Sequence, residues 1–109
     1  MRLNSKAKSK RASLPRQADF TRQFLKDWER LVHSGRYDMS KLKCVMLSLI
    51  ANDAPLDPIF RDHELVGNWK GFRECHIVGD FLLIYKLDKT PKVQTLIFTR
   101  VGTHAELFE

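Results

Sequence analysis

The sequence predicts an α+β fold, in which a two-helix N-terminal hairpin packs on one face of an antiparallel β-sheet of three to four strands. Two observations carry this prediction. Between residues 18 and 53 the apolar residues recur at helical intervals, and from Phe72 onward they alternate with a period of two. The alternating region is divided by Gly79-Asp80, a residue pair typical of the turn in a β-hairpin.

The first helix is predicted within residues 18–35. Asp19 is available as its N-cap, and Gly35 can end it. The expected apolar face of this helix comprises Phe20, Phe24, Leu25, Trp28, Leu31 and Val32.

The second helix is predicted within residues 37–53, where Asp38 or Ser40 can cap the start. The link through Gly35 is short, so the two helices should pack as an antiparallel hairpin. The expected apolar face of the second helix comprises Leu42, Val45, Met46, Leu49 and Ile50.

Prolines and glycines interrupt regular structure between residues 54 and 71, which we expect to form an ordered loop. Residues 14–18 are a candidate for a strand at the edge of the sheet, although Pro15 cannot donate a hydrogen bond to a ladder. The other strands are predicted at residues 72–78, 81–87 and 93–101.

The turn at Gly79-Asp80 predicts a register for the hairpin. The pairs expected on one face are Val78 with Phe81, His76 with Leu83, and Glu74 with Tyr85. That face should point away from the helices and should also hold Leu96, Phe98 and Arg100. The face toward the helices would then be formed by Cys75, Ile77, Leu82 and Ile84.

The composition points to one compact domain, because the chain has 109 residues of which 43% are hydrophobic. No apolar run is long enough for a membrane span or a secretory signal, so we expect a soluble protein of the cytoplasm. The two cysteines fit no paired metal-ligand spacing and are too few for a disulfide scaffold. They are expected to be reduced and mostly packing residues.

Residues 1–15 are predicted to be a basic, flexible extension of a single domain at residues 16–109. Residues 1–16 contain six basic residues and no acid, which accounts for the whole net charge of +6. Three interpretations are open: an arm that attracts nucleic-acid phosphates, a solvated leader without a specific role, or a transit peptide.

Titratable residues in the sheet region form the candidate site. His63 lies in the loop, His76 lies in the hairpin, and His104 follows the last strand. Asp80 at the turn adds a carboxylate, and Arg100 near the end of the last strand adds a fixed positive charge. Imidazoles titrate near neutral pH and therefore suit general acid-base catalysis. Taken singly, His76 also fits a structural histidine, and Asp80 fits a turn-forming residue.

A metal site built from the histidines and Cys75 is the less favoured interpretation of the same residues. No pair among His63, Cys75, His76 and His104 has the spacing of helical metal ligands or of a cysteine knuckle. We therefore expect no metal and no other cofactor.

Four segments resemble the YafQ branch of the RelE/ParE toxin superfamily: "SKLKCVMLSLI", "FRDHELVGNWKGFRECHI", "GDFLLIYKL" and "TRVGTHAELF". They occur in the family's order and at family-like spacing, and the similarity runs from about Asp19 to Phe108. Two positions depart from the family pattern, since Phe81 stands where Trp is frequent and Gly79 stands where Pro is common.

The resemblance implies the toxin of a type II toxin-antitoxin system, acting as a ribosome-dependent mRNA endoribonuclease, or mRNA interferase. The implied partners are a cognate antitoxin, the ribosome, and mRNA in the ribosomal A site, with no membrane. The implied active-site residues are His63, His76, Asp80, His104 and Phe108, with Arg100 as a charge stabiliser.

RNA cleavage without a metal can use the 2′-hydroxyl of the substrate as nucleophile, and histidines suit both proton transfers. We assign one transfer to His104 and the other to His63 or His76, with possible help from Asp80. Phe108 would stack on a base.

Residues around these positions have two interpretations each. Lys70, Arg73 and Lys86 are either phosphate contacts in substrate binding or solvated charges. Trp69 is expected to anchor the loop on the core, since large aromatic residues are mostly buried, and stacking on RNA is the alternative.

Two other classes of function share parts of this pattern. A ParE-like toxin of the same fold would bind a protein target such as gyrase without cutting RNA. Several histidines on one face argue against it, because binding alone needs no proton-transfer groups. A simple nucleic-acid-binding module would depend on the basic N-terminal residues. Deletion of residues 1–13 would remove most of its affinity and salt dependence, whereas a nuclease would keep its cleavage chemistry.

Overall fold

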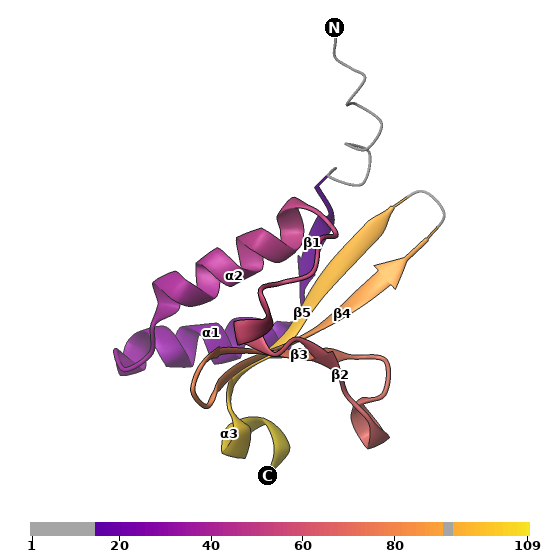
Figure 1. The fold of residues 1–109 in the computed structure, drawn as a ribbon. Helices are drawn as coiled ribbons and strands as arrows, with labels where there is room; N and C mark the ends of the chain where they lie inside the picture. Colours follow the sequence, from indigo (N-terminus) through magenta and orange to yellow (C-terminus); the bar gives the residue numbers. More distant parts are fainter. Residues whose placement is uncertain (1–14, 91–92) are drawn as a thin grey trace, which may run out of the picture.

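The computed structural model describes residues 15–90 and 93–109, which form one sheet with helices on both faces (Figure 1). The predicted basic extension lies outside the described residues, except for Pro15. The elements are β1 (Gln17–Phe20), α1 (Arg22–Ser34), α2 (Met39–Ala51), η3 (Pro58–Phe60), β2 (His63–Glu64), η4 (Gly67–Trp69), β3 (Arg73–Val78), β4 (Phe81–Lys89), β5 (Gln94–Thr103) and α3 (His104–Phe108).

Across the described residues the sheet contains five strands in the order β1-β5-β4-β3-β2. The predicted α+β class is confirmed, and the sheet is larger than the three to four strands expected. It is also mixed, because β1 runs parallel to β5 while the other pairs are antiparallel. The edge strand expected at residues 14–18 begins and ends later, at Gln17–Phe20. The strand β2 was not predicted, because a strand of two residues is too short to show an alternation of apolar and polar residues.

The helix α1 begins later than predicted. Residues 17–20 are extended because they pair with residues 95–98 of β5, so Asp19 cannot cap the helix. Thr21 is the N-cap instead, and its hydroxyl oxygen accepts a hydrogen bond from the Phe24 amide at 3.0 Å.

The two long helices form the predicted hairpin and cover one face of the sheet (Figure 1). Gly35 ends α1 in the left-handed conformation, with φ of 68°, and Asp38 caps α2 by accepting from the Lys41 amide at 2.9 Å. The core between helices and sheet comprises Phe24, Leu31, Leu42, Val45, Met46, Leu49, Cys75, Ile77, Phe81, Leu83, Tyr85, Leu96, Phe98 and Val101.

The β3–β4 hairpin has a bulge that changes its register. Val78 pairs with Phe81 as predicted, but the pairing shifts between His76 and Val78, which leaves Ile77 as the extra residue. The pairs beyond the bulge are His76 with Leu82, Cys75 with Leu83, Glu74 with Ile84, and Arg73 with Tyr85.

The bulge corrects the predicted assignment of side chains to faces, because a shift of one residue reverses the direction of each side chain. Leu82 and Ile84 lie on the face away from α1 and α2, which we call the far face, whereas Leu83 and Tyr85 join the helix-side core. A second shift in register lies between Ile84 and Tyr85, in the pairing of β4 with β5. Leu96 and Phe98, predicted for the far face, are buried under the helices.

The far face is partly covered, so it is less open than predicted. Leu82 and Ile84 of β4 are buried there against Leu107 of α3, and residues of the loop that contains η4 pack on the same cluster. Trp69 packs on this cluster, in agreement with its expected role as an anchor of the loop. The residues partly buried against the cluster are Leu65, Trp69, Phe72 and Phe108.

Two expectations from composition concern the membrane and the cysteines. Within residues 15–90 and 93–109, every helix is too short or too polar to cross a lipid bilayer. Cys75 is buried in the core as a packing residue, whereas Cys44 is exposed on α2, so the packing prediction holds for one thiol of the two.

Candidate active site

His63 and His76 lie on either side of the Glu74 carboxylate on the far face. Nε2 of His63 is 3.4 Å from Glu74 Oε1, and Nε2 of His76 is 3.5 Å from the same oxygen. The sheet produces this arrangement, because His63 of β2 pairs with Glu74 of β3 and His76 follows two residues later on the same face. Glu74 is only 6% exposed, so two half-exposed imidazoles share one buried carboxylate.

The second nitrogen of each ring also faces an oxygen. Nδ1 of His63 lies 2.6 Å from the Arg61 carbonyl oxygen, and Nδ1 of His76 lies 3.4 Å from the Gly79 carbonyl oxygen. A carbonyl oxygen only accepts, so Nδ1 of His63 is the donor and its Nε2 is directed at Glu74. Nε2 is therefore the atom of this ring at which a proton can be held beside the carboxylate and released.

A second group forms where the β3–β4 turn meets α3. The Asp80 carboxylate accepts a hydrogen bond from the His104 amide at 3.2 Å. The rings of His104 and Phe108, one helical turn apart, have centroids 4.9 Å apart. The Phe108 ring also meets Trp69 edge-on at 5.9 Å. Asp80 thus contacts the first residue of α3, and α3 sets the position of the exposed His104 ring.

The sheet register relates the two groups to each other. His76 pairs with Leu82, and Leu82 pairs with Gly102, two residues before His104. Leu107 of α3 packs in one cluster with Leu82, which keeps α3 on the far face. His63, His76 and His104 therefore belong to the same face, in two neighbouring groups of which only the first is joined by a shared carboxylate.

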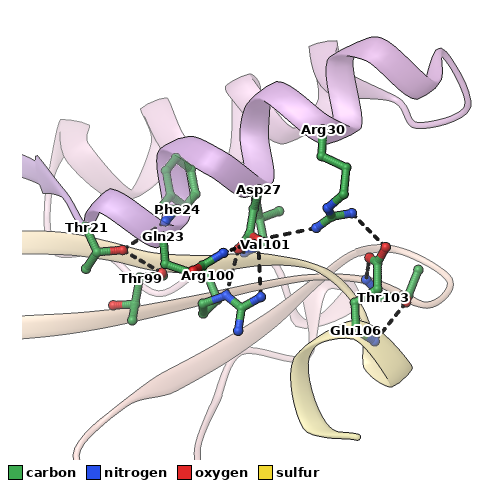
Figure 2. A network of polar contacts seen from close by, with 10 residues as sticks. All are labelled: Thr21, Gln23, Phe24, Asp27, Arg30, Thr99, Arg100, Val101, Thr103 and Glu106. Carbon is green, nitrogen blue, oxygen red and sulfur yellow. Dashed lines mark hydrogen bonds and ion pairs between the residues drawn. The ribbon is translucent and has the colours of Figure 1, made fainter.

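Arg100 is bound by α1 (Figure 2). Its Nε donates to Asp27 Oδ2 at 2.7 Å, its Nη2 donates to Oδ1 at 3.2 Å, and the Val101 amide donates to Oδ2 at 3.1 Å. Burial by itself would raise the pKa of Asp27, but hydrogen bonds from Arg100, Val101 and Gln23 outweigh it and lower that pKa below the ordinary 3.8. The positive charge expected at Arg100 is therefore accompanied by a buried negative charge.

α1 also holds α3. Arg30 Nη1 donates to Glu106 Oε2 at 2.7 Å, while Glu106 Oε1 accepts from the Thr103 amide at 2.8 Å (Figure 2). The Glu106 amide donates to Thr103 Oγ1 at 3.3 Å, which completes a capping box. Gly102 leaves room for this carboxylate, because a Cβ there would lie 2.6 Å from Glu106 Oε1. One helix thus secures both Arg100 and the short helix that carries His104.

The three cations predicted to bind substrate have different surroundings. Lys86 lies on the far face, with Nζ 5.5 Å from the centroid of the Phe72 ring. Lys70 is exposed directly after η4. Arg73 pairs with Tyr85 and so lies on the helix side, where its Nε donates to Asp62 at 3.2 Å.

Asp62 also accepts a hydrogen bond from the Tyr85 hydroxyl at 2.7 Å. Burial raises the pKa of Tyr85, and the bond to Asp62 raises it further. Burial likewise raises the pKa of the Cys75 thiol, so both groups are neutral at physiological pH. Tyr85, Asp62 and Arg73 form a structural network behind the site, and Cys75 is a packing residue.

Comparison with known proteins identifies the family. A family model described as the bacterial toxin of type II toxin-antitoxin system, YafQ, matches residues 16–109. The chain is 44% identical over 95 residues to the mRNA interferase toxin YafQ of Escherichia coli strain K12, which covers 87% of this chain and 98% of that protein. The chain belongs to the YafQ toxin family. It is therefore a toxin of the type II toxin-antitoxin class, and the resemblance seen in its motifs is confirmed.

Solved YafQ structures agree with this assignment. YafQ from Escherichia coli strain BL21(DE3) is 41% identical, with a TM-score of 0.76 over 86% of this chain and 99% of that chain. The Escherichia coli DinJ-YafQ toxin-antitoxin complex matches at 42% identity, with a TM-score of 0.75 over 88% of this chain and 100% of that chain. The fold described above is thus the YafQ fold.

The sequence does not single out one residue of the candidate site. It predicts Glu74 on the far face opposite Tyr85, as part of a half-exposed recognition surface, with no catalytic role. The signal that could have revealed it is the Glu-x-His spacing within a strand, which puts the carboxylate of Glu74 beside His76 on one face. His63 could not be added from spacing, because its position depends on the short strand β2.

Proposed function

We propose that this YafQ-family toxin is an mRNA endoribonuclease that acts on the ribosome, in the cytoplasm, without a metal cofactor. The single observation that carries the proposal is the set of three imidazoles on the far face of the sheet, two of which share the buried Glu74 carboxylate. The Escherichia coli relative, the mRNA interferase toxin YafQ, supports the same class of reaction.

The proposed reaction uses the substrate's own 2′-hydroxyl as nucleophile. A base removes the 2′-hydroxyl proton, the 2′-oxygen attacks the adjacent phosphorus, and the bond from phosphorus to the 5′-oxygen breaks. An acid protonates the departing 5′-oxygen, so the products are a 2′,3′-cyclic phosphate and a 5′-hydroxyl. Each positioned proton transfer contributes on the order of 10²–10⁴-fold to such a rate.

In this proposal His104 carries out one proton transfer and the pair His63 and His76 carries out the other. Glu74 orients the pair, because its carboxylate oxygen faces both Nε2 atoms. Asp80 acts through His104, by holding the amide at the start of α3.

The proposed contacts with RNA surround these groups. Phe108 stacks on a base, an interaction worth about 1–3 kcal/mol, and Lys86 and Lys70 contact phosphates. Arg73 has less support, because it is committed to Asp62 on the helix side. Arg100 stabilises charge on the phosphoryl oxygens, with its effect reduced by the neighbouring Asp27 carboxylate.

The proposed partners are a cognate antitoxin, the ribosome, and mRNA in the ribosomal A site. The antitoxin is supported by the solved DinJ-YafQ complex, whose toxin is 42% identical to this chain over nearly its full length. The antitoxin would keep the toxin inactive until it is removed.

Primer extension on a translating message, with purified protein and with or without ribosomes, tests the proposal. Cleavage only in the presence of ribosomes is expected. Cleavage of free RNA at the same rate would refute ribosome dependence, and absence of cleavage in both arms would favour a toxin that binds a protein target.

A further inference from the structure

A cleft borders the His63–His76 pair at the edge of β3. It has a volume of about 310 Å³ and is lined by Lys41 of α2, by residues 59–61, and by residues 76–79. The cleft exists because β2 pairs only with Arg73 and Glu74, which leaves the rest of the β3 edge without a strand beside it. Cavities from about 300 Å³ upward are the usual size for small-molecule sites, so this one suits a single nucleotide.

Two cations line the cleft, Lys41 from α2 and Arg61 from the loop after η3. All 13 acidic residues of the chain lie within the described residues, and none is within 4.0 Å of either cation. Arg73, Arg100 and Arg30 by contrast are all paired with carboxylates. The two cleft cations are therefore free to bind an anion.

The cleft is connected directly to the candidate active site. His76 is part of its lining, and the Arg61 carbonyl oxygen accepts the hydrogen bond from Nδ1 of His63. A group bound in the cleft would therefore lie beside His76, and the backbone of Arg61 connects the cleft to His63. Under the proposed function, such a group would lie close to the scissile phosphate.

Apolar side chains form the remainder of the lining. Ile59 is 71% exposed and Val78 is 49% exposed, and both border the cleft. An apolar surface beside two cations matches the chemistry of a nucleotide, which joins a charged phosphate to a ribose and a base.

We propose that this cleft binds one nucleotide of the mRNA next to the scissile bond, with Lys41 and Arg61 on its phosphate and Ile59 and Val78 against its ribose or base. This assignment rests on the proposed function. It adds a binding subsite on the β3 edge to the catalytic groups on the far face, so the message would pass from the sheet edge across His76 toward His104.

Arg61 also has a structural position at the end of η3, where its amide donates to the Pro58 carbonyl oxygen at 3.0 Å. Its φ is 50°, in the left-handed region where glycine or asparagine is more favourable. Its carbonyl oxygen contacts Nδ1 of His63, and Arg61 is one of the residues that line the cleft.

The test compares the double variant Lys41→Gln/Arg61→Gln with the matched control Lys26→Gln/Arg36→Gln. The control removes the same charge from exposed positions on α1 and the turn after it. Both proteins and the wild type are assayed for the KM and kcat of cleavage on programmed ribosomes. Binding of each to a short single-stranded RNA that lacks the reactive 2′-hydroxyl is measured by fluorescence anisotropy, so the cleft is tested even where no cleavage occurs.

We expect the cleft variant to raise KM and the RNA dissociation constant about tenfold, as the loss of charge-assisted hydrogen bonds predicts, with kcat within about twofold of wild type. The control should change both constants by less than about twofold. Equal effects of the two double variants would overturn the subsite. Binding of each protein to the cognate antitoxin is measured in parallel, and an unchanged KM with weakened antitoxin binding would also overturn the subsite and assign the cleft to that protein.

The outcomes separate this inference from the proposed function. If the wild type fails to cleave on ribosomes while the cleft variant still loses RNA affinity, the proposed reaction fails and the nucleotide site survives. If the wild type cleaves normally and the cleft variant matches the control in both assays, the reaction survives and the nucleotide site fails. Thermal unfolding of each variant verifies that the fold is intact.

Discussion

Asp27 of α1 and Arg100 of β5 form a bidentate ion pair, with Oδ2 2.7 Å from Nε and Oδ1 3.2 Å from Nη2. The Asp27 side chain is 2% exposed, and it also accepts from the Val101 amide. The pair joins the helix layer to the strand that leads into His104. Because a buried carboxylate without its partner is costly, this contact is a structural requirement of the site as well as a source of local charge.

Replacing Asp27 with asparagine should lower the free energy of unfolding by about 1–3 kcal/mol, the range for hydrogen bonds to charged groups. Asparagine keeps an oxygen for the Val101 amide, so the substitution removes mainly the negative charge that faces Arg100 and Arg30. Urea unfolding provides the measurement. Asp53→Asn, at an exposed aspartate, should change stability by less than about 0.5 kcal/mol. Equal losses in the two variants would contradict a specific role for the pair.

The stability contribution of Asp27 should depend on pH. Its pKa in the folded protein is lowered below the ordinary 3.8, so the unfolded chain takes up the proton first as pH falls. The contribution is fully present above about pH 4 and is lost as pH falls through the folded pKa. The difference in unfolding free energy between wild type and Asp27→Asn should therefore shrink below that pH. A difference that stays constant from pH 6 to pH 2.5 would contradict the assignment.

Glu74→Gln should lower kcat for cleavage about a hundredfold, the lower end of what one positioned proton transfer contributes. Glutamine keeps the size of the side chain but removes the negative charge between the rings of His63 and His76. Primer-extension kinetics on ribosomes and the pH profile of kcat are the measurements. Glu29→Gln, at an exposed position of α1, is the control. A pH profile of unchanged shape with normal kcat would remove Glu74 from the mechanism.

His104→Ala should lower kcat by about 10²–10⁴-fold, because it removes a complete proton-transfer group. The ring is exposed, so the fold should tolerate its loss, which thermal unfolding can verify. His33→Ala, at the exposed end of α1, should cleave at the wild-type rate. Cleavage by His104→Ala at the wild-type rate would eliminate the central assignment of the proposed mechanism.

Gly102→Ala should displace α3 and reduce cleavage, because the added Cβ would lie 2.6 Å from Glu106 Oε1 and disturb the capping box. The effect should depend on that carboxylate. Because Gly102 also has a φ of 159°, which alanine rarely adopts, Gly102→Ala/Glu106→Ala should still lose some stability beyond Glu106→Ala, but less than Gly102→Ala loses in the wild type, which a double-mutant cycle on melting temperature and kcat measures. Strictly additive losses would show that the glycine matters for another reason.

The predictable parts of this structure are those encoded by local spacing. The helix hairpin, its stop at Gly35, the cap at Asp38 and the turn at Gly79-Asp80 all follow from residues that are neighbours in the chain. The start of α1 did not follow, because Asp19 is drawn into pairing with a strand that is far away in sequence. The bulges could not be predicted either, because the alternation of apolar residues does not reveal an extra residue in one strand.

The candidate site also combines features that the sequence predicts with features that depend on the tertiary structure. The sequence by itself determined the family, the helical layer over a sheet, and the identities of His63, His76, Asp80 and His104 as residues to test. Only the tertiary structure decided that Glu74 lies buried between two of these imidazoles and that Arg100 is paired with Asp27. The physical reason is that a contact between strands, or between helix and strand, depends on register and bulges. These are set by the packing of the whole sheet and are not written in the spacing of any one segment.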